Sequence, residues 1–255
     1  MTTLNSTHRF SDRVENYILS RPSYPPEVLE TLHHECSLTP ASVVADVACG
    51  TGIFTRLLLE NGNRVFGIEP NREMREAANR LLGSYSNFEG AIDGTAEATS
   101  LPDHSVDFVT AAQAAHWFNL PEARREFVRI LQPGGWMVLL WNQRITDSTP
   151  FLRGYEQLLK TFAVDYEKVR HEHTTDGIAS FFAPQPYRLR EFPMHQDFTY
   201  NALERRLLSS SYVPLEGHGN YTPMLAELRR LFGAHQADGR VRLDYTTRMY
   251  YAQVP

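Results

Sequence analysis

The sequence lacks several features that would place it in a specialised class. It has only two cysteines, Cys36 and Cys49, in 255 residues, which excludes a disulfide framework and leaves too few thiolates for a zinc site. No apolar run approaches the roughly 20 residues of a membrane span, and residues 1–5 lack a signal-peptide pattern. The net charge of -5 argues against a general nucleic-acid or membrane-surface binder. We therefore expect a reduced, cytoplasmic protein without a nucleic-acid or membrane partner.

An alternation of strand and helix patterns occupies the first part of the chain. It begins with a strand that runs from Val43 into a glycine turn. Further strands are predicted at 64–69, within 87–92, at 106–112 and at 136–141, with helices at 54–60, at 72–82 with Asn71 as its cap, and at 121–131. This alternation predicts an α/β fold with a Rossmann-like, doubly wound, mostly parallel sheet and helices on both faces.

After Asn142 the alternation stops. We expect helices across most of 150–182, a strand at 189–200, helices at 201–211 and 223–235, and a final strand at 240–254. No linker rich in proline or glycine separates these elements from the first part. We therefore expect a single domain, 1–255, in which 143–255 is a helical elaboration that ends in two strands.

The turn after the first strand carries the clearest chemical signal. Gly50 and Gly52 allow a backbone to approach a ligand without Cβ clashes. A dinucleotide fingerprint would need a third glycine where Thr55 stands. Asp46 ends the strand below the turn, where a carboxylate would repel a pyrophosphate and attract a cationic ligand. An ordinary turn without a ligand is the alternative.

The run Asp46–Gly52 resembles motif I of the class I S-adenosylmethionine-dependent methyltransferases, with Ala48 in place of the first glycine. The runs 111–118 and 131–135, together with Tyr17 to Pro25, resemble the branch of trans-aconitate methyltransferase-like proteins, also called methyltransferase type 11. The resemblance implies S-adenosylmethionine as the cofactor, a small-molecule methyl acceptor, and a seven-stranded sheet whose last strand is antiparallel. Within it, 37–142 would be the cofactor-binding core.

Cofactor-binding residues follow from the resemblance. Glu69, about 20 residues after the turn, would accept two hydrogen bonds from the ribose diol, as it also would from a nicotinamide cofactor. Thr95 stands where the family usually has an aspartate for the adenine amino group, so Thr95 or Asp93 would accept that bond; a simple loop is the alternative. The full set predicted on the cofactor side is Asp46, Ala48, Cys49, Gly50, Gly52, Glu69, Pro70, Met74, Thr95, Ala96, Glu97, Gln113, Tyr17 and Arg21.

The stretch ahead of the first strand is predicted to be a lid. Prolines stiffen the end of Arg9–Pro25, and this aromatic segment has no core of its own. We expect Tyr17, Arg21 and Tyr24 to face the site, with Arg21 near the carboxylate of the donor and Tyr24 on the acceptor side. In this division of the chain, 1–36 is the lid segment. A loosely packed terminal arm is the alternative.

Two histidine motifs have competing interpretations. His116 follows the fourth strand and is either a general base beside the acceptor or a structural partner of Trp117; both residues are assigned to the acceptor side. His171 and His173 flank Glu172, but this spacing on a polar loop is a poor metal signature, so no metal site is predicted. Aromatic residues after Asn142 either line the acceptor pocket or belong to the core; they are Tyr155, Tyr166, Phe181 and Phe182.

The sequence therefore predicts a methyltransferase that acts on a small molecule, with O-methylation of a carboxylate or a hydroxyl group. Two alternatives stay open. One is a regulatory protein that binds adenosylmethionine without catalysis, and the other is a nicotinamide-dependent oxidoreductase. Asp46 and the missing third glycine count against the oxidoreductase.

Overall fold

The computed structural model describes residues 21–166 and 177–255. The elements of the first part are α2 (Glu27–Cys36), β1 (Val43–Val47), α3 (Ile53–Glu60), β2 (Arg64–Ile68), α4 (Arg72–Leu82), β3 (Phe88–Ile92), β4 (Val106–Ala112), η2 (Ala115–Trp117), α5 (Leu120–Ile130) and β5 (Leu131–Arg144). The second part adds α6 (Pro150–Phe162), α8 (Ile178–Phe182), β6 (Arg188–Phe198), α9 (Tyr200–Leu208), α10 (Tyr221–His235) and β7 (Val241–Gln253).

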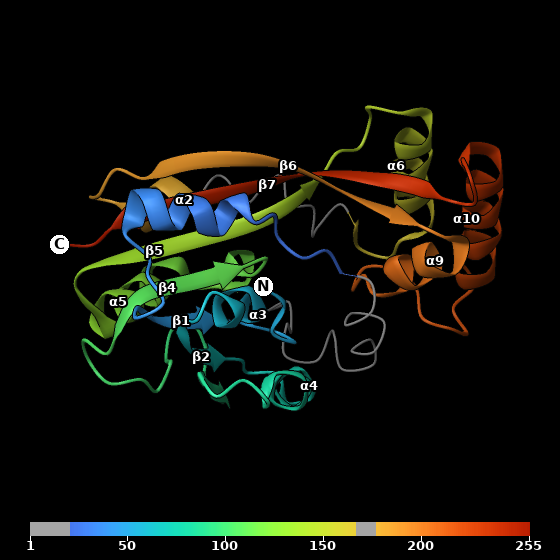
Figure 1. Cartoon of the computed structure of the whole chain (residues 1–255). Helices are drawn as coiled ribbons and strands as arrows, with labels where there is room; N and C mark the ends of the chain where they lie inside the picture. The colour runs from blue at the N-terminus through green and yellow to red at the C-terminus, as the bar shows by residue number, and fades with distance from the viewer. Residues whose placement is uncertain (1–20, 167–176) are drawn as a thin grey trace.

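The strands form a seven-stranded sheet in the order β3-β2-β1-β4-β5-β7-β6 (Figure 1). Neighbours from β3 to β5 pair in parallel, and β7 runs antiparallel to both β5 and β6. The predicted mostly parallel sheet with an antiparallel last strand is therefore confirmed. Because β1 lies between β2 and β4, the connections diverge at its carboxyl end, where open α/β sheets bind ligands.

Hydrophobic cores cover both faces of this sheet. On one face, Leu32 of α2 and Leu58 of α3 are buried in the same cluster as Val44 of β1. On the opposite face, Phe127 of α5 and Phe181 of α8 pack with apolar residues of β1, β4 and β5. The helices therefore anchor the parallel strands from both sides, as the alternation of strands and helices predicts.

A third hydrophobic core lies beyond the parallel strands. The outer strands β5 to β7 are longer than the inner ones, and they extend to α6, α9 and α10 (Figure 1). Leu152 of α6, Leu207 of α9 and Leu228 of α10 pack there against Leu243 and Tyr245 of β7. These helices are the predicted elaboration after the fifth strand. They bring side chains from distant parts of the sequence to the end of the sheet.

The start of β5 differs from the prediction. The run 133–135, which lies between the predicted helix at 121–131 and the predicted strand at 136–141, is part of β5 in the structure. Val106 of β4 pairs with Leu131 and Phe108 pairs with Trp136, so β5 has extra residues between these pairs. A bulge accommodates such residues without ending the strand. The turn-forming residues therefore mark a bulge in the ladder and not its beginning.

Candidate active site

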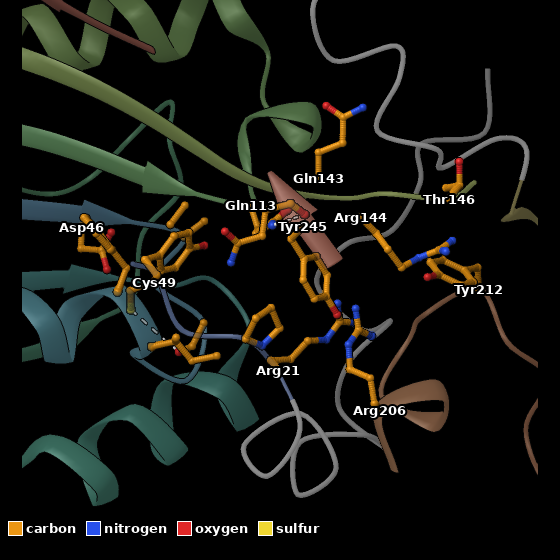
Figure 2. Close-up of a pocket in the computed structure, with 18 of the residues that line it drawn as sticks. Arg21, Asp46, Cys49, Gln113, Gln143, Arg144, Thr146, Arg206, Tyr212 and Tyr245 are labelled. Carbon is orange, nitrogen blue, oxygen red and sulfur yellow. Dashed lines mark hydrogen bonds between the residues drawn. The ribbon is translucent and has the colours of Figure 1, made fainter. Parts of the chain in front are cut away.

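A pocket opens at the carboxyl ends of β1 and β4 and continues toward the third core (Figure 2). The space among its lining atoms is about 1100 Å³ when the part open to solvent is included. Figure 2 shows a strand end, around Asp46 and Cys49, and a far end, around Arg144, Arg206 and Tyr212. The lining residues are Arg21, Pro22, Tyr24, Asp46, Ala48, Cys49, Gly50, Ile53, Phe54, Ala112, Gln113, Asn142, Gln143, Arg144, Thr146, Tyr166, Arg206, Tyr212 and Tyr245.

The backbone of the glycine turn explains its residue types. Ala48, Gly50 and Gly52 have positive φ angles of 55°, 59° and 85°, a conformation that costs an alanine about 1–2 kcal/mol. A Cβ on Gly52 would lie 2.4 Å from Cδ1 of Leu82 in α4, so a larger residue would be strained at this positive φ angle and would displace that side chain. A Cβ on Gly50, which borders the pocket, would meet nothing within 4 Å. The turn therefore presents bare backbone to the pocket.

Asp46 is the buried acid at the strand end, with 1% of its surface exposed. Its Oδ2 accepts a hydrogen bond from Thr55 Oγ1 at 2.6 Å, and its Oδ1 accepts one from Thr110 Oγ1 at 2.9 Å. Burial raises the pKa of Asp46 to about 6, although both hydroxyls lower it. Within residues 21–166 and 177–255, no basic side chain forms an ion pair with it. A cation in the pocket would therefore stabilise its charged form.

Glu69 follows β2 and links the glycine turn to α4. Its Oε2 accepts a hydrogen bond from the amide of Gly50 at 2.8 Å, and its Oε1 accepts one from the amide of Asn71 at 2.9 Å. Burial raises the pKa of Glu69, whereas the amides of Asn71 and Gly50 lower it. Glu69 supports the turn from behind and does not itself line the pocket. Its role in ribose binding stays a prediction.

The remaining residues predicted on the adenine side lie outside this pocket. Met74 belongs to the buried face of α4, and Thr95 is exposed. Asp93, the alternative to Thr95, forms an ion pair with Arg75 at 3.2 Å. Glu97 accepts a hydrogen bond from a backbone amide near η2. The set that the structure places around β2 and β3, away from the pocket lining, is Pro70, Met74, Thr95, Ala96 and Glu97.

The segment before α2 forms one wall of the pocket. Arg21 Nη2 donates a hydrogen bond to the carbonyl of Ser209 at 2.9 Å, and Asn142 Nδ2 donates one to the carbonyl of Ser23 at 3.0 Å. The ring of Tyr24 is buried edge-on against Phe54, with centroids 5.1 Å apart. These contacts hold the wall in place between the parallel sheet and α9.

The rest of the predicted lid segment divides into two parts. Residues 27–36 form α2, which packs in the core of one sheet face and not over the pocket. Tyr17 lies outside the described residues, as do His171, Glu172 and His173. The lid prediction can therefore be compared with the structure only at residues 21–36.

The residues after β4 take two different positions. Gln113 lines the pocket with a positive φ of 59°, and its Nε2 donates a hydrogen bond to the carbonyl of Asn142 at 3.1 Å. Such strain in a residue other than glycine is common at functional sites. His116 and Trp117 lie on η2 with ring centroids 4.6 Å apart, and neither lines the pocket. A catalytic role for His116 stays a prediction.

Arg144 is one of the two buried arginines at the far end. Its Nη2 lies 2.5 Å from Oε2 of Glu156 and 3.0 Å from the hydroxyl of Tyr166, and its guanidinium lies over the ring of Tyr155. The hydroxyl of Tyr166 also donates a hydrogen bond to Glu156 at 2.8 Å. Burial raises the pKa of Tyr166, so this phenol is not a base near neutral pH. The charge of Arg144 is compensated by Glu156.

Arg206 of α9 has no such carboxylate. It is 7% exposed, and its Nη1 lies 3.2 Å from Oγ of Ser210. Among the described residues, no acid forms an ion pair with it, and its Nε is buried without a hydrogen-bond partner. Burial lowers the pKa of Arg206, but the phenols of Tyr245, Tyr155 and Tyr212 raise it by more. The net pKa is therefore raised, and the guanidinium keeps its charge.

The residues of the far end, apart from Tyr166, were not predicted from the sequence. A signal exists at α9, where Arg206 lies three residues after Leu203 and one before Leu207, on the face that should be apolar. Tyr245 alternates with apolar residues along β7, and Arg144 is the last residue of β5. No local motif joins these positions. Of the aromatic residues proposed as pocket walls, Tyr166 lines the pocket, whereas Tyr155, Phe181 and Phe182 lie in hydrophobic cores.

Known proteins resemble this chain in sequence. Residues 45–139 match a family described as a methyltransferase domain. An uncharacterised methyltransferase of Mycobacterium tuberculosis is 39% identical over 137 residues, which are 53% of this chain and 52% of the relative. An uncharacterised methyltransferase-like protein of Schizosaccharomyces pombe is 26% identical over 251 residues, 96% of this chain and 94% of the relative. For several curated relatives, the match spans only about half of their length.

Solved structures have the same fold. A proposed type II methyltransferase from Anaeromyxobacter dehalogenans superposes with a TM-score of 0.67 at 22% identity, covering 92% of this chain and 99% of that one. Residues 45–139 therefore match a methyltransferase domain, and the chain as a whole has the fold of this solved structure. S-adenosylmethionine is the cofactor that the resemblance of the sequence implies, and the residues at the strand end fit it. Gly50 offers bare backbone, and Asp46 offers a buried carboxylate suited to an ammonium group. Membership of the trans-aconitate-like branch stays a prediction.

Two further findings concern the described residues, 21–166 and 177–255. They contain no group of three or more histidine, cysteine, aspartate and glutamate side chains that could hold a metal ion. None of their helices combines the length and apolar character needed to cross a membrane. Cys36 is buried, Cys49 is half-buried, and neither forms a disulfide.

Proposed function

We propose that this chain catalyses methyl transfer from S-adenosylmethionine to an oxygen atom of a small molecule, either a carboxylate or a hydroxyl group. The observation that carries the proposal is the continuity of the pocket. It begins at a strand end suited to the donor and continues to a polar far end. The far end is lined by arginine and tyrosine side chains, which suit a polar, oxygen-containing acceptor.

Donor binding is assigned to the strand end. When bound there, S-adenosylmethionine would supply an electrophilic methyl group to the acceptor oxygen, and its sulfur would keep the electron pair of the broken bond. Asp46 would hold the ammonium group of the donor, and the bare backbone at Gly50 would allow close approach. Glu69 would accept from the ribose only if its carboxylate keeps free lone pairs beside the two amides it already binds. Orientation and exclusion of water are the main tasks left to the protein.

The placement of His116 favours an acceptor that needs no base. Its ring lies on η2 outside the pocket lining. A carboxylate acceptor is ionised at neutral pH without help. A hydroxyl acceptor would profit from a general base. Of the two acceptors, the carboxylate therefore fits the pocket better.

The segment before α2 supports the lid part of the proposal. Residues 21–24 are attached to the sheet and to α9 by the contacts of Arg21, Ser23 and Tyr24. Deletion of residues 1–25 should weaken donor binding by at least about tenfold, because a wall of the pocket is lost. The variant that lacks residues 1–25 should still unfold cooperatively. Full donor affinity after the deletion would show that the segment is only a terminal arm.

We also propose that residues 1–255 form one methyltransferase domain. A reducing, cytoplasmic location is part of this proposal, as expected for a chain with only two cysteines. A small molecule, and not a nucleic acid, is the proposed acceptor.

Calorimetric titration with S-adenosylmethionine, S-adenosylhomocysteine and NADH tests the donor assignment. The first two should bind and NADH should not. A screen of small acids, phenols and alcohols with a donor labelled in its methyl group then tests catalysis. Donor binding without transfer to any acceptor would favour a regulatory binding protein, and NADH binding would favour an oxidoreductase.

A further inference from the structure

The charge balance at the far end of the pocket is incomplete. Arg144 and Arg206 both line the pocket, and both are largely buried. Glu156 compensates Arg144 at 2.5 Å, and its other oxygen lies 3.7 Å from the ammonium of Lys160. No second acid of the described residues compensates Arg206. The ligand-free far end therefore carries an excess of positive charge.

A buried guanidinium without a counter-ion is costly, because water solvates the charge better than the protein interior does. Arg206 is held on α9 among Tyr155, Tyr212 and Tyr245, whose phenols offer dipoles but no full negative charge. Its buried Nε has no hydrogen-bond partner within the described part of the chain. A charge kept at this cost in a ligand pocket is expected to have an anionic partner that arrives from outside.

The direction of these side chains fits that expectation. Figure 2 shows the guanidinium of Arg206 and the hydroxyl of Tyr245 pointing toward one another on one side of the pocket, with Arg144 and Tyr212 beyond them. Asp46 lies at the opposite end of the same pocket. Phenol hydroxyls can donate hydrogen bonds to an anion, and arginine can bind one through two parallel bonds.

We propose that Arg206, together with Tyr245, forms an anion-binding subsite for the acceptor. It takes a carboxylate or phosphate group that is not methylated and so holds the acceptor at the far end, while another oxygen reaches the methyl group. The acceptor is therefore an acid whose anionic group lies apart from the reacting oxygen. That the bound acid is methylated rests on the proposed function. That Arg206 and Tyr245 bind an anion does not depend on it.

The first test measures thermal unfolding without a ligand, in Arg206→Met and in Arg144→Met. Arg206→Met removes an uncompensated buried charge, so its Tm should stay equal to that of the wild type or rise. Arg144→Met leaves Glu156 buried beside the remaining groups, so its Tm should fall by at least about 2 °C. A comparable fall in Arg206→Met would overturn the proposal, because it would make Arg206 a structural residue.

The second test uses glutarate and inorganic phosphate as probes with the protein saturated by S-adenosylhomocysteine. At least one probe should raise the Tm of the wild type, and which one does so distinguishes a carboxylate from a phosphate site. Neither glutarate nor phosphate should raise the Tm of Arg206→Met, and Arg206→Lys should keep part of the rise in Tm. Arg242→Met is the matched control, because Arg242 of β7 is exposed and forms an ion pair with Asp197 of the edge strand β6. This variant should respond like the wild type. Equal responses of Arg206→Met and the wild type would overturn the proposal.

A third test separates this inference from the proposed function. With a labelled methyl donor, wild-type acceptors should be acids with a second anionic group, and their neutral esters should react at least about a hundredfold more slowly. Arg206→Met should lose this preference while its donor affinity stays within about twofold. Transfer to neutral and anionic acceptors alike would overturn the subsite and leave methyl transfer intact. Absence of any transfer would contradict the proposed function, whereas the glutarate and phosphate responses would still decide the subsite.

Discussion

The two ends of the pocket are built in different ways. At the strand end, Asp46 and Gly50 lie four residues apart on one strand and its turn. At the far end, Arg144 comes from β5, Arg206 from α9 and Tyr245 from β7. The strand end is therefore a local feature of the chain, whereas only the folded third core brings the far end together. A common donor chemistry can thus be combined with an acceptor site that changes independently.

Donor affinity should be more sensitive to loss of a charge at the strand end than at the far end. Asp46→Asn should weaken binding of S-adenosylmethionine by roughly a hundredfold, because a charge-assisted hydrogen bond contributes about 1.5–3 kcal/mol. The thermal stability of Asp46→Asn at pH 7 should not be lower than that of the wild type, because burial already disfavours the charged carboxyl of Asp46. Calorimetry and thermal unfolding check the two effects. Unchanged affinity would remove Asp46 from the donor site.

Glu69 tests how far the strand end extends. Glu69→Gln should reduce donor affinity by roughly tenfold. Glutamine cannot accept hydrogen bonds from the amides of both Gly50 and Asn71, so the turn should loosen as well. Hydrogen exchange at Gly50 separates the two causes. Normal affinity together with faster exchange would make Glu69 a support of the turn only.

The pH dependence of donor affinity should come from the strand end alone. The folded pKa of Asp46, about 6, lies above the value of about 3.9 usual for an unfolded chain. Folding favours the protonated form of Asp46. The contribution of Asp46 to the free energy of unfolding therefore decreases as the pH rises from about 4 to about 6. Donor affinity should instead rise about tenfold between pH 5 and 7, because the charged carboxylate binds the cation. In Asp46→Asn this rise should be absent; its persistence would point to another titrating group.

His116 should have the smallest effect. Because its ring lies outside the pocket lining, His116→Gln should change turnover by less than about threefold on a carboxylate acceptor. Trp117→Ala is the companion variant on η2. A loss of about a hundredfold or more that eases as the pH rises would instead identify His116 as a general base for a hydroxyl acceptor.

The contrast between the two ends also explains what the sequence could predict. The order of strands and helices, the Asn71 cap and the glycine turn depend on neighbouring residues, and the structure has them: Asn71 Oδ1 accepts a hydrogen bond from the amide of Met74. Asp46 was recognised because the strand and the turn lie together in the chain. Arg206 was not, because its pocket depends on how α9 packs against β7. A single charged residue on an apolar helix face was the one available signal.

The central claim is that the pocket has two separable ends, one for the donor and one for an anionic acceptor. The most direct measurement is calorimetric titration of S-adenosylmethionine into the wild type, Asp46→Asn and Arg206→Met under the same conditions at pH 7. The account predicts a loss of roughly a hundredfold in Asp46→Asn and a change within about twofold in Arg206→Met. Equal losses in both variants, or none in either, would contradict it.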